Sequence, residues 1–289
     1  MPRPDPIAPG IARLRAANPS PMTGEGTNTY LVGEDSVAVI DPGPAAPAHL
    51  DAIEEALKGR VLSHILVTHA HLDHSALAPE LARRHGAPVL AFGDAEAGRA
   101  PHMAALAGIG GGEGVDTGFA PDLTLADGDV VRGQGWEIEA LHTPGHMGGH
   151  LSFLLGGVAF SGDHVMGWAS SLVSPPDGDM GAYVASLHRL RARAPKRLLP
   201  GHGAPVEDPA ARIDWLIAHR AGREAQIRAA LVRGEADAAR IARAIYRDIP
   251  QVLMPAAERS VLAHLVDLER KGEVETDDAP GPAAIFRSV

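Results

Sequence analysis

Thr68-His69-Ala70-His71-Leu72-Asp73-His74 follows directly on the apolar run His64-Ile65-Leu66-Val67, so four candidate metal ligands stand within six residues. Alternate side chains of a strand share one face, and we therefore expect His69 and His71, at the strand's carboxyl end, to point at one ion. The following residues, 75–84, have a helical pattern, which leaves Asp73 and His74 near the helix start and free to bind a second ion. The stretch predicts a two-metal centre at a strand end.

Two ions need more donors than these four residues supply, because each zinc takes about four, including a water or substrate atom. His146 lies in the Pro-Gly turn of residues 143–150, between two strand-like runs. Asp163 follows the apolar segment 151–160, which we interpret as one strand, and a carboxylate there can bridge two ions. His202 follows another short apolar strand in the segment 198–203, Leu-Leu-Pro-Gly-His-Gly. All the candidates therefore fall at strand ends.

The ordered set of ligands resembles the metallo-β-lactamase superfamily over roughly residues 12–220, and the segments 26–32 and 39–43 are similar to its opening hairpin. The resemblance implies an α/β (α+β) fold, the αββα sandwich. It also implies two metal sites, with Asp163 as the bridging carboxylate. The first site would be held by His69, His71 and His146, and the second by Asp73, His74 and His202.

The chemistry expected of such a centre is hydrolysis by a hydroxide held between two divalent ions. Asp73 is the expected catalytic residue, because besides binding the second ion it can orient the water and pass on its proton. With only imidazole and carboxylate ligands, zinc is the expected metal, although manganese and iron also accept such ligands. His71 favours hydrolysis, since the flavo-di-iron members of the superfamily resemble a Glu at this position. The motif is also compatible with a persulfide dioxygenase that holds a single iron.

The remaining histidines are assigned other positions. His150 and His164 stand within a few residues of predicted ligands, so we expect them to give hydrogen bonds that orient these ligands. The others are expected at helix surfaces or at the edge of the core: His49, His64, His85, His102, His142, His188, His219 and His264.

Composition limits the class of protein. The 289 residues are 45% hydrophobic, enough for a full core, and contain no Cys, which excludes disulfides and thiolate ligands. The net charge of −10 weighs against a generic nucleic-acid-binding surface, although divalent ions can attract an anionic substrate locally. The N-terminal residues have no apolar signal region and no stretch approaches the length of a membrane span, so we expect a cytoplasmic protein without a membrane partner.

Beyond Arg220 the pattern changes to helices with apolar stripes, followed by two short strands, 272–276 and 283–286, around a polar turn. This order resembles a winged helix, so we predict a catalytic domain over residues 1–221 and a winged-helix domain over 222–289. With the metal core, several tail positions resemble the lactamase-β-2-like branch, whose best-known members cleave single-stranded RNA. These positions are Tyr246, Pro250, Ala257, Ser260, His264, Leu265 and Gly272.

The expected recognition helix, 256–271, has balanced charges, whereas a helix that grips phosphates should be basic. Packing on the core, covering the cleft and forming a homodimer are therefore alternative roles for this domain. In the segment 165–172, Met166 and Trp168 either line a substrate pocket or belong to the core. The Gly-rich stretch 104–118 either borders the active site or is a surface connection.

Three functions remain open. The first is a metal hydrolase that cleaves single-stranded RNA, as the branch implies. The second is a hydrolase of small-molecule esters, either a glyoxalase-II-like or acyl thioesterase or a lactonase, on the same site. No Lys or Arg stands out near the ligands as a carboxylate clamp, which counts against the glyoxalase-II-like form. The third is a non-catalytic nucleic-acid-binding module.

Overall fold

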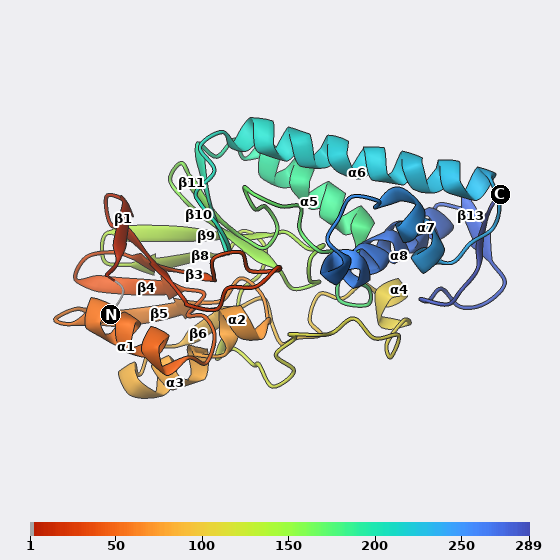
Figure 1. Cartoon of the computed structure of the whole chain (residues 1–289). Helices are drawn as coiled ribbons and strands as arrows, with labels where there is room; N and C mark the ends of the chain where they lie inside the picture. Colours follow the sequence, from red (N-terminus) through yellow and green to blue (C-terminus); the bar gives the residue numbers. More distant parts are fainter. Residues whose placement is uncertain (1–2) are drawn as a thin grey trace.

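Two β-sheets packed face to face form the larger part of the computed structural model, which describes residues 3–289 (Figure 1). The first sheet runs in sequence order through β1 Asp5–Ala8, β2 Ile11–Arg15, β3 Asn28–Val32, β4 Ser36–Ile40, β5 Val61–Leu66, β6 Val89–Ala91 and β7 Leu123–Thr124. The second has the order β12 Arg197–Pro200, β11 Val158–Gly162, β10 Leu151–Leu155, β9 Trp136–His142 and β8 Val130–Gly133.

Apolar side chains fill the space between the sheets, where Tyr30 and Phe160 meet edge to face with their ring centroids 5.2 Å apart. Helices α1 Pro47–Leu57 and α3 Ala78–His85 bury Ile53 and Leu81 against the outer face of the first sheet. Helices α5 Met180–Ala192 and α6 Pro209–Val232 cover the second sheet in the same way. The predicted αββα sandwich is confirmed.

Two local predictions of secondary structure were wrong. The apolar segment 151–160 is not one strand, because Gly156, with φ +58°, turns the chain at Gly156-Gly157 and makes a hairpin of β10 and β11. The expected helix over residues 75–84 is divided into a short helix, α2 Leu72–Ser75, and α3, which has Pro79 in its first turn. The division places Asp73 and His74 inside α2.

The C-terminal part is a separate small core of helices with a two-stranded sheet, and it has the predicted winged-helix form. It contains α7 Ala238–Ile245, α8 Met254–Arg270 with a preceding 3-10 turn at Gln251–Leu253, and the antiparallel pair β13 Val274–Thr276 and β14 Phe286–Ser288. The short helix α4 Pro101–Ala104 contributes Met103 to this core, and the loop that follows it contributes Leu106.

Helix α6 joins the two parts. Ile213 and Leu216 pack beneath the second sheet, whereas Ile227 and Leu231 belong to the C-terminal core. The domain division predicted between residues 221 and 222 falls inside this single helix and stays a prediction; the first two residues of the predicted catalytic domain lie outside the described part. Across residues 3–289, none of the helices combines the length and apolar character that crossing a bilayer requires.

Candidate metal centre

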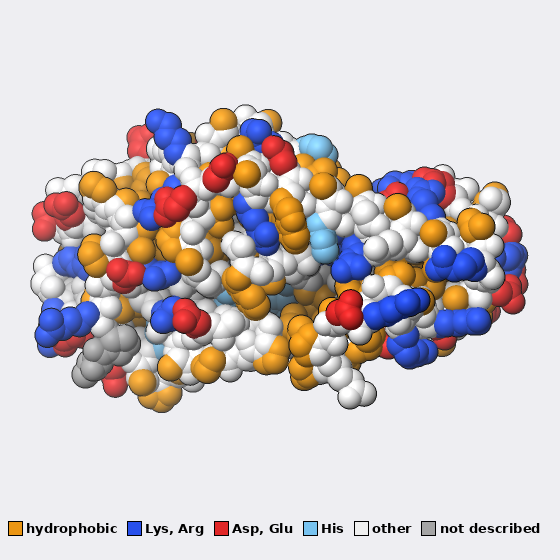
Figure 2. Space-filling view, turned by 45° about the horizontal axis from the view of Figure 1, so that its top comes forward, with side chains coloured by type: hydrophobic (Ala, Val, Ile, Leu, Met, Phe, Trp, Pro, Cys, Tyr) orange, Lys and Arg blue, Asp and Glu red, His pale blue; other side chains and the backbone are white. Residues whose placement is uncertain are grey.

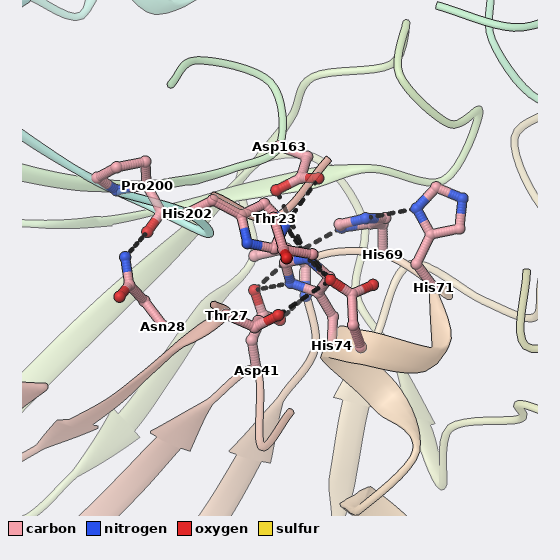
Figure 3. Close-up of polar contacts among 12 residues, drawn as sticks. Thr23, Thr27, Asn28, Asp41, His69, His71, His74, Asp163, Pro200 and His202 are labelled. Carbon is pink, nitrogen blue, oxygen red and sulfur yellow. Dashed lines mark hydrogen bonds and ion pairs between the residues drawn. The ribbon is translucent and has the colours of Figure 1, made fainter. Parts of the chain in front are cut away.

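The predicted ligands meet at one end of the sandwich, where loops leave the strands (Figure 3). His69 and His71 follow β5, whose parallel pairing with β4 and β6 fixes the direction in which the chain leaves the sheet. Asp73 and His74 belong to α2. His146, Asp163 and His202 lie in the loops that follow β9, β11 and β12. A backbone hydrogen bond of 2.7 Å from Asn28 to Gly201 ties the two sheets together beside the site.

His69, His71 and His146 form the first group, with ligand atoms that all lie within 4.8 Å of one another. Nδ1 of His71 is 2.9 Å from Nε2 of His69 and 3.0 Å from Nε2 of His146. A tetrahedral zinc with Zn–N bonds of about 2.0–2.1 Å separates its nitrogen ligands by roughly 3.3 Å. The group therefore fits one ion after a small outward shift of the rings.

Asp73, His74 and His202 form the second group. Nε2 of His202 lies 3.3 Å from Nε2 of His74 and 3.3 Å from Oδ2 of Asp73, and this carboxylate oxygen is 3.5 Å from Nε2 of His74. These separations match the tetrahedral spacing closely.

Asp163 lies between the two groups. Its Oδ1 is 3.5 Å from His74 Nε2, and its Oδ2 is 3.3 Å from His202 Nε2 and 3.8 Å from His146 Nε2. Oδ1 is buried and has no hydrogen-bond partner among the described residues. A buried carboxylate oxygen without a donor is costly, and a cation at this position would satisfy it. The clustered histidine and aspartate side chains are therefore compatible with binding a metal.

The pKa values of the histidines differ between the two groups of predicted ligands. Burial, reinforced by the neighbouring His146, lowers the pKa of His71 to about 3, so its imidazole is neutral and keeps a lone pair for an ion. Burial also opposes protonation of His74 and His202, but the carboxylates of Asp73 and Asp163 outweigh it. They raise the pKa of His74 to about 9 and that of His202 to about 11. The two carboxylates thus favour positive charge in the second group, whether it is carried by protons or by a bound cation.

Hydrogen bonds from residues outside the predicted set orient several ligands. Thr27 Oγ1 donates to Asp73 Oδ2 over 3.0 Å, and His146 Nδ1 donates to the carbonyl of Leu172 over 2.7 Å. Asp41 receives hydrogen bonds from the backbone and side chain of Thr68, at 2.7 and 2.8 Å, and contacts His74. No such role was predicted for Asp41; its Asp-Pro-Gly turn directly after β4 is the signal that could have indicated one.

The other histidines differ in part from expectation. Nδ1 of His150 pairs with Thr143 Oγ1, and its ring stacks on His69 with centroids 5.2 Å apart. Within residues 3–289, neither His150 nor His164 makes the expected hydrogen bond to a predicted ligand. His49 and His264, expected at a surface or a core edge, are buried.

A cavity of about 400 Å³ opens from the predicted ligands toward the C-terminal part. Figure 2 shows a hollow there, with hydrophobic side chains at its rim and histidine at its depth. Met166 and Trp168 line the cavity, and Glu113 and Gly114 bring the 104–118 loop to its edge. The opposite wall comes from the C-terminal part: Tyr246, Ile249, Leu253, Ala256, Ala257 and Ser260. The winged-helix part thus covers the cleft, one of the roles considered for it.

Two glycines leave the space that the Trp168 ring occupies. A Cβ on Gly24 would lie 3.3 Å from the indole, and one on Gly203 would lie 2.6 Å from it. Both glycines have positive φ, at +60° and +84°, so the turns and the ring fit together only without side chains.

Arg220, in the middle of α6, also lines the cavity. No Lys or Arg was expected near the ligands from the sequence, and the position of Arg220 corrects that expectation. A charged residue inside a helical pattern is ordinarily placed on the solvent face, whereas Arg220 is only 2% exposed. Its position depends on how α6 turns against the sheet, which the sequence alone does not reveal.

Comparison with known families supports the assignment of both parts. The sequence model described as "Metallo-beta-lactamase superfamily" matches residues 22–202, and the one described as "Beta-lactamase associated winged helix domain" matches residues 238–281. The "Beta-lactamase-like protein 2 homolog" of Drosophila melanogaster is 31% identical, over 93% of this chain and 90% of its own.

Two further relatives are informative. The "Atrochrysone carboxyl ACP thioesterase AgnL7" of Paecilomyces divaricatus is 33% identical, over 84% of this chain and 71% of its own. A crystal structure of a metallo-beta-lactamase family protein from Thermus thermophilus superposes with a TM-score of 0.77 at 25% identity, covering 98% of this chain and 99% of that one. The fold is therefore shared over both parts of the molecule.

Proposed function

The chain belongs to the metallo-beta-lactamase superfamily and is a hydrolase of that superfamily. From this premise we propose that it hydrolyses small-molecule acyl-thioesters. The proposal rests on one observation above all, the apolar cavity that opens from the predicted ligands and is closed on its far side by the C-terminal part. An enclosed apolar pocket suits an acyl chain.

RNA is the weaker candidate. A groove for single-stranded nucleic acid follows the backbone with positive charge and stacks bases on aromatic rings. Among residues 3–289, the cavity lining includes Arg220 as its sole Lys or Arg and Trp168 and Tyr246 as its aromatic rings. The thioesterase name of the Paecilomyces divaricatus relative supports the other choice. Lactones present a similar carbonyl carbon and remain the second candidate substrate.

We infer that the protein binds two divalent ions, most simply zinc, which the two ligand groups and Asp163 would hold; manganese and iron are the alternatives. When bound, such ions supply an activated water and stabilise the negative charge that develops on the carbonyl oxygen. Thioester hydrolysis adds water to the carbonyl carbon and breaks the C–S bond, which gives a carboxylic acid and a thiol.

The chain's own residues position these reactants. Thr27 holds Oδ2 of Asp73 by its hydrogen bond, so Asp73 is fixed in a position to accept a proton from water and return it to the leaving thiolate. Met166 and Trp168 would hold the acyl chain from the sandwich side, and Leu253 would hold it from the C-terminal side. The contact of these side chains with the acyl chain would exclude bulk water from the reacting carbonyl.

The test compares substrates on one preparation. We expect about two zinc ions per chain by elemental analysis, hydrolysis of acyl-thioesters, and loss of that activity on treatment with a chelator. Single-stranded RNA, a phosphodiester and a lactone complete the panel. Cleavage of RNA without thioester turnover would overturn the proposal, and a single bound iron with oxygen-dependent persulfide consumption would replace it with the dioxygenase.

Asp73→Asn tests the proposed catalytic residue, with the exposed Asp35→Asn as the matched control. We expect the Asp73 variant to stay folded and lose most turnover, by about 10²-fold or more, because the amide cannot accept the proton. The control should keep full activity. Undiminished turnover in the Asp73 variant would remove Asp73 from the mechanism.

A further inference from the structure

The cavity contains a buried cation, Arg220, which forms no ion pair with a carboxylate of residues 3–289. Arg220 is 2% exposed and lines the same cavity as the predicted ligands Asp73 and His202. We propose that Arg220 binds a carboxylate carried by the acyl group, so that the substrates are thioesters of dicarboxylic or similarly acidic acyl groups. The nature of the bond that is cleaved rests on the proposed thioesterase function, whereas the anion site stands on the contacts of Arg220 itself.

The guanidinium of Arg220 is incompletely satisfied. One terminal nitrogen donates to the carbonyl of Ser171, and the group lies over the ring of Tyr183, 5.2 Å from its centroid. Nε is buried and has no hydrogen-bond partner within residues 3–289. Arg220 also has no carboxylate partner within ion-pair distance in that part of the chain. A guanidinium offers five N–H donors and is always charged, so this environment leaves its charge uncompensated.

Two neighbouring arginines make more hydrogen bonds than Arg220 does. Arg259, on α8, donates to the carbonyls of Ile109, Gly110 and Pro175 and to Ser174 Oγ, which fastens the C-terminal part to two loops. Arg212, eight residues before Arg220 on α6, donates to the carbonyls of Met166 and Ala169. The structural cross-links near the cavity are therefore made by other arginines.

The titratable groups described around Arg220 form no ion pair with it. His264, on the facing helix α8, is kept neutral because burial and then the charge of Arg220 lower its pKa to about 3. The carboxylates that line the cavity are Asp73 and Asp163, which belong to the predicted metal centre, and Glu113, on the loop that Arg259 fastens. A ligand anion would supply the missing charge.

A carboxylate matches this site better than a phosphate does. One guanidinium balances a single charge and pairs with a carboxylate through two parallel hydrogen bonds. A phosphate dianion brings a second charge and further oxygens, for which the lining provides no other Lys or Arg within the described residues. The apolar side chains that line the cavity suit the methylene chain of a dicarboxylic acyl group.

The decisive measurement uses pairs of N-acetylcysteamine thioesters matched in length, one ending in a carboxylate and one in a methyl amide, from succinyl to suberyl. The metal-loaded wild-type protein should prefer the carboxylate at one chain length. Arg220→Met should lower kcat/KM for that substrate by about 100-fold, mainly through KM, and leave the amide partner within about threefold. Arg220→Lys should retain part of the preference. Equal loss on both substrates, or an unchanged preference, would overturn the proposal and leave Arg220 a structural residue.

A binding measurement separates this inference from the proposed function. If no thioester is hydrolysed, thermal stabilisation of metal-loaded protein by free suberate, with suberamide as the uncharged control, still reports on Arg220. We expect suberate to raise the melting temperature more for the wild type than for Arg220→Met, since binding at the metals is common to both. Stabilisation that does not depend on Arg220 would contradict the anion site. Stronger Arg220-dependent stabilisation by inorganic phosphate would contradict the choice of carboxylate.

Discussion

Oδ2 of Asp41 lies 3.0 Å from Nδ1 of His74, on the side of the ring that faces away from the predicted metal centre (Figure 3). When a proton on Nδ1 is shared with this carboxylate, Nε2 is the nitrogen left to bind an ion beside Asp73 and Asp163. Asp41 reaches this position with φ +50°, a left-handed conformation uncommon for a residue with a side chain. Hydrogen bonds from Thr68 hold it there. Backbone strain is thus concentrated next to the site.

Asp41→Asn should weaken metal binding at the second group. The amide cannot stabilise the Nδ1 proton as a carboxylate does, and loss of such an orienting partner typically lowers metal affinity by about 10- to 100-fold. Titration with a competing chelator measures the change, and the exposed Asp35→Asn is the control. Unchanged affinity together with an intact fold would show that Asp41 stabilises the turn and does not orient His74.

Gly201→Ala should disturb the same site by steric crowding alone. A Cβ at this position would lie 2.5 Å from Oδ1 of Asp163 and 2.6 Å from Cε1 of His74, so both side chains would have to move. We expect at least about a tenfold loss of metal affinity, with little change in the circular dichroism of the fold.

Gly222→Ala is the matched control for this substitution. Gly222 lies in α6 with no atom near its added Cβ, and the change should stabilise the protein by about 0.5–1 kcal/mol. Normal metal content in Gly201→Ala, measured under the same conditions, would contradict the steric account.

Local sequence was enough to propose the ligands, which stay a prediction, because each of them follows an apolar run that forms a strand. The strand before His69 sets the alternation that brings His69 and His71 together, and a Pro-Gly turn exposes His146. The prediction from local sequence was wrong where two strong patterns adjoin. The segment 151–160 is apolar on both sides of Gly156-Gly157, and the glycine pair, itself a hairpin signal, was outweighed by the continuous apolar run.

Arg220 and the far wall of the cavity depend on tertiary packing, which local patterns do not contain. Arg220 contacts Ser171, 49 residues earlier in the chain, only because α6 lies across the end of the second sheet. The balanced charge of α8 did not indicate which elements this helix packs against. What decides its position is the burial of Ala263 and Leu265 between α5, α6 and the C-terminal core.

Stability should fall as the pH falls below about 6.5, in part because of His264. Burial, followed by the charge of Arg220, lowers the pKa of His264 to about 3, whereas in the unfolded chain it titrates near its usual 6.5. Between these values the unfolded state binds the extra proton, so the stabilising contribution is complete above pH 6.5 and is lost as the pH falls toward 3.

His264→Leu should flatten this dependence. Urea unfolding at pH 7.5 and at pH 5 gives the free energy of unfolding of each protein, and the variant should lose less between the two. His188→Leu, on α5, serves as the control, because His188 is exposed. At pH 7.5 the His264 variant should be at least as stable as the wild type, since both ring nitrogens of His264 lack hydrogen-bond partners among the described residues. Parallel losses in the wild type and the variant would rule out His264 as a source of the acid sensitivity.

Leu253→Ala tests whether the C-terminal part recognises the acyl chain. Leu253 belongs to the wall of the cavity opposite Trp168, so truncating it removes apolar contact from a long chain but not from an acetyl group that reaches only the metal centre. We expect kcat/KM for long acyl-thioesters to fall by about tenfold, mostly through KM, and that for acetyl-thioesters to change by less than about threefold. Val252→Ala is the control, because Val252 is the adjacent residue, is 69% exposed and does not line the cavity. A loss that is the same for every chain length would mean that the winged-helix part supports the fold without contacting substrate.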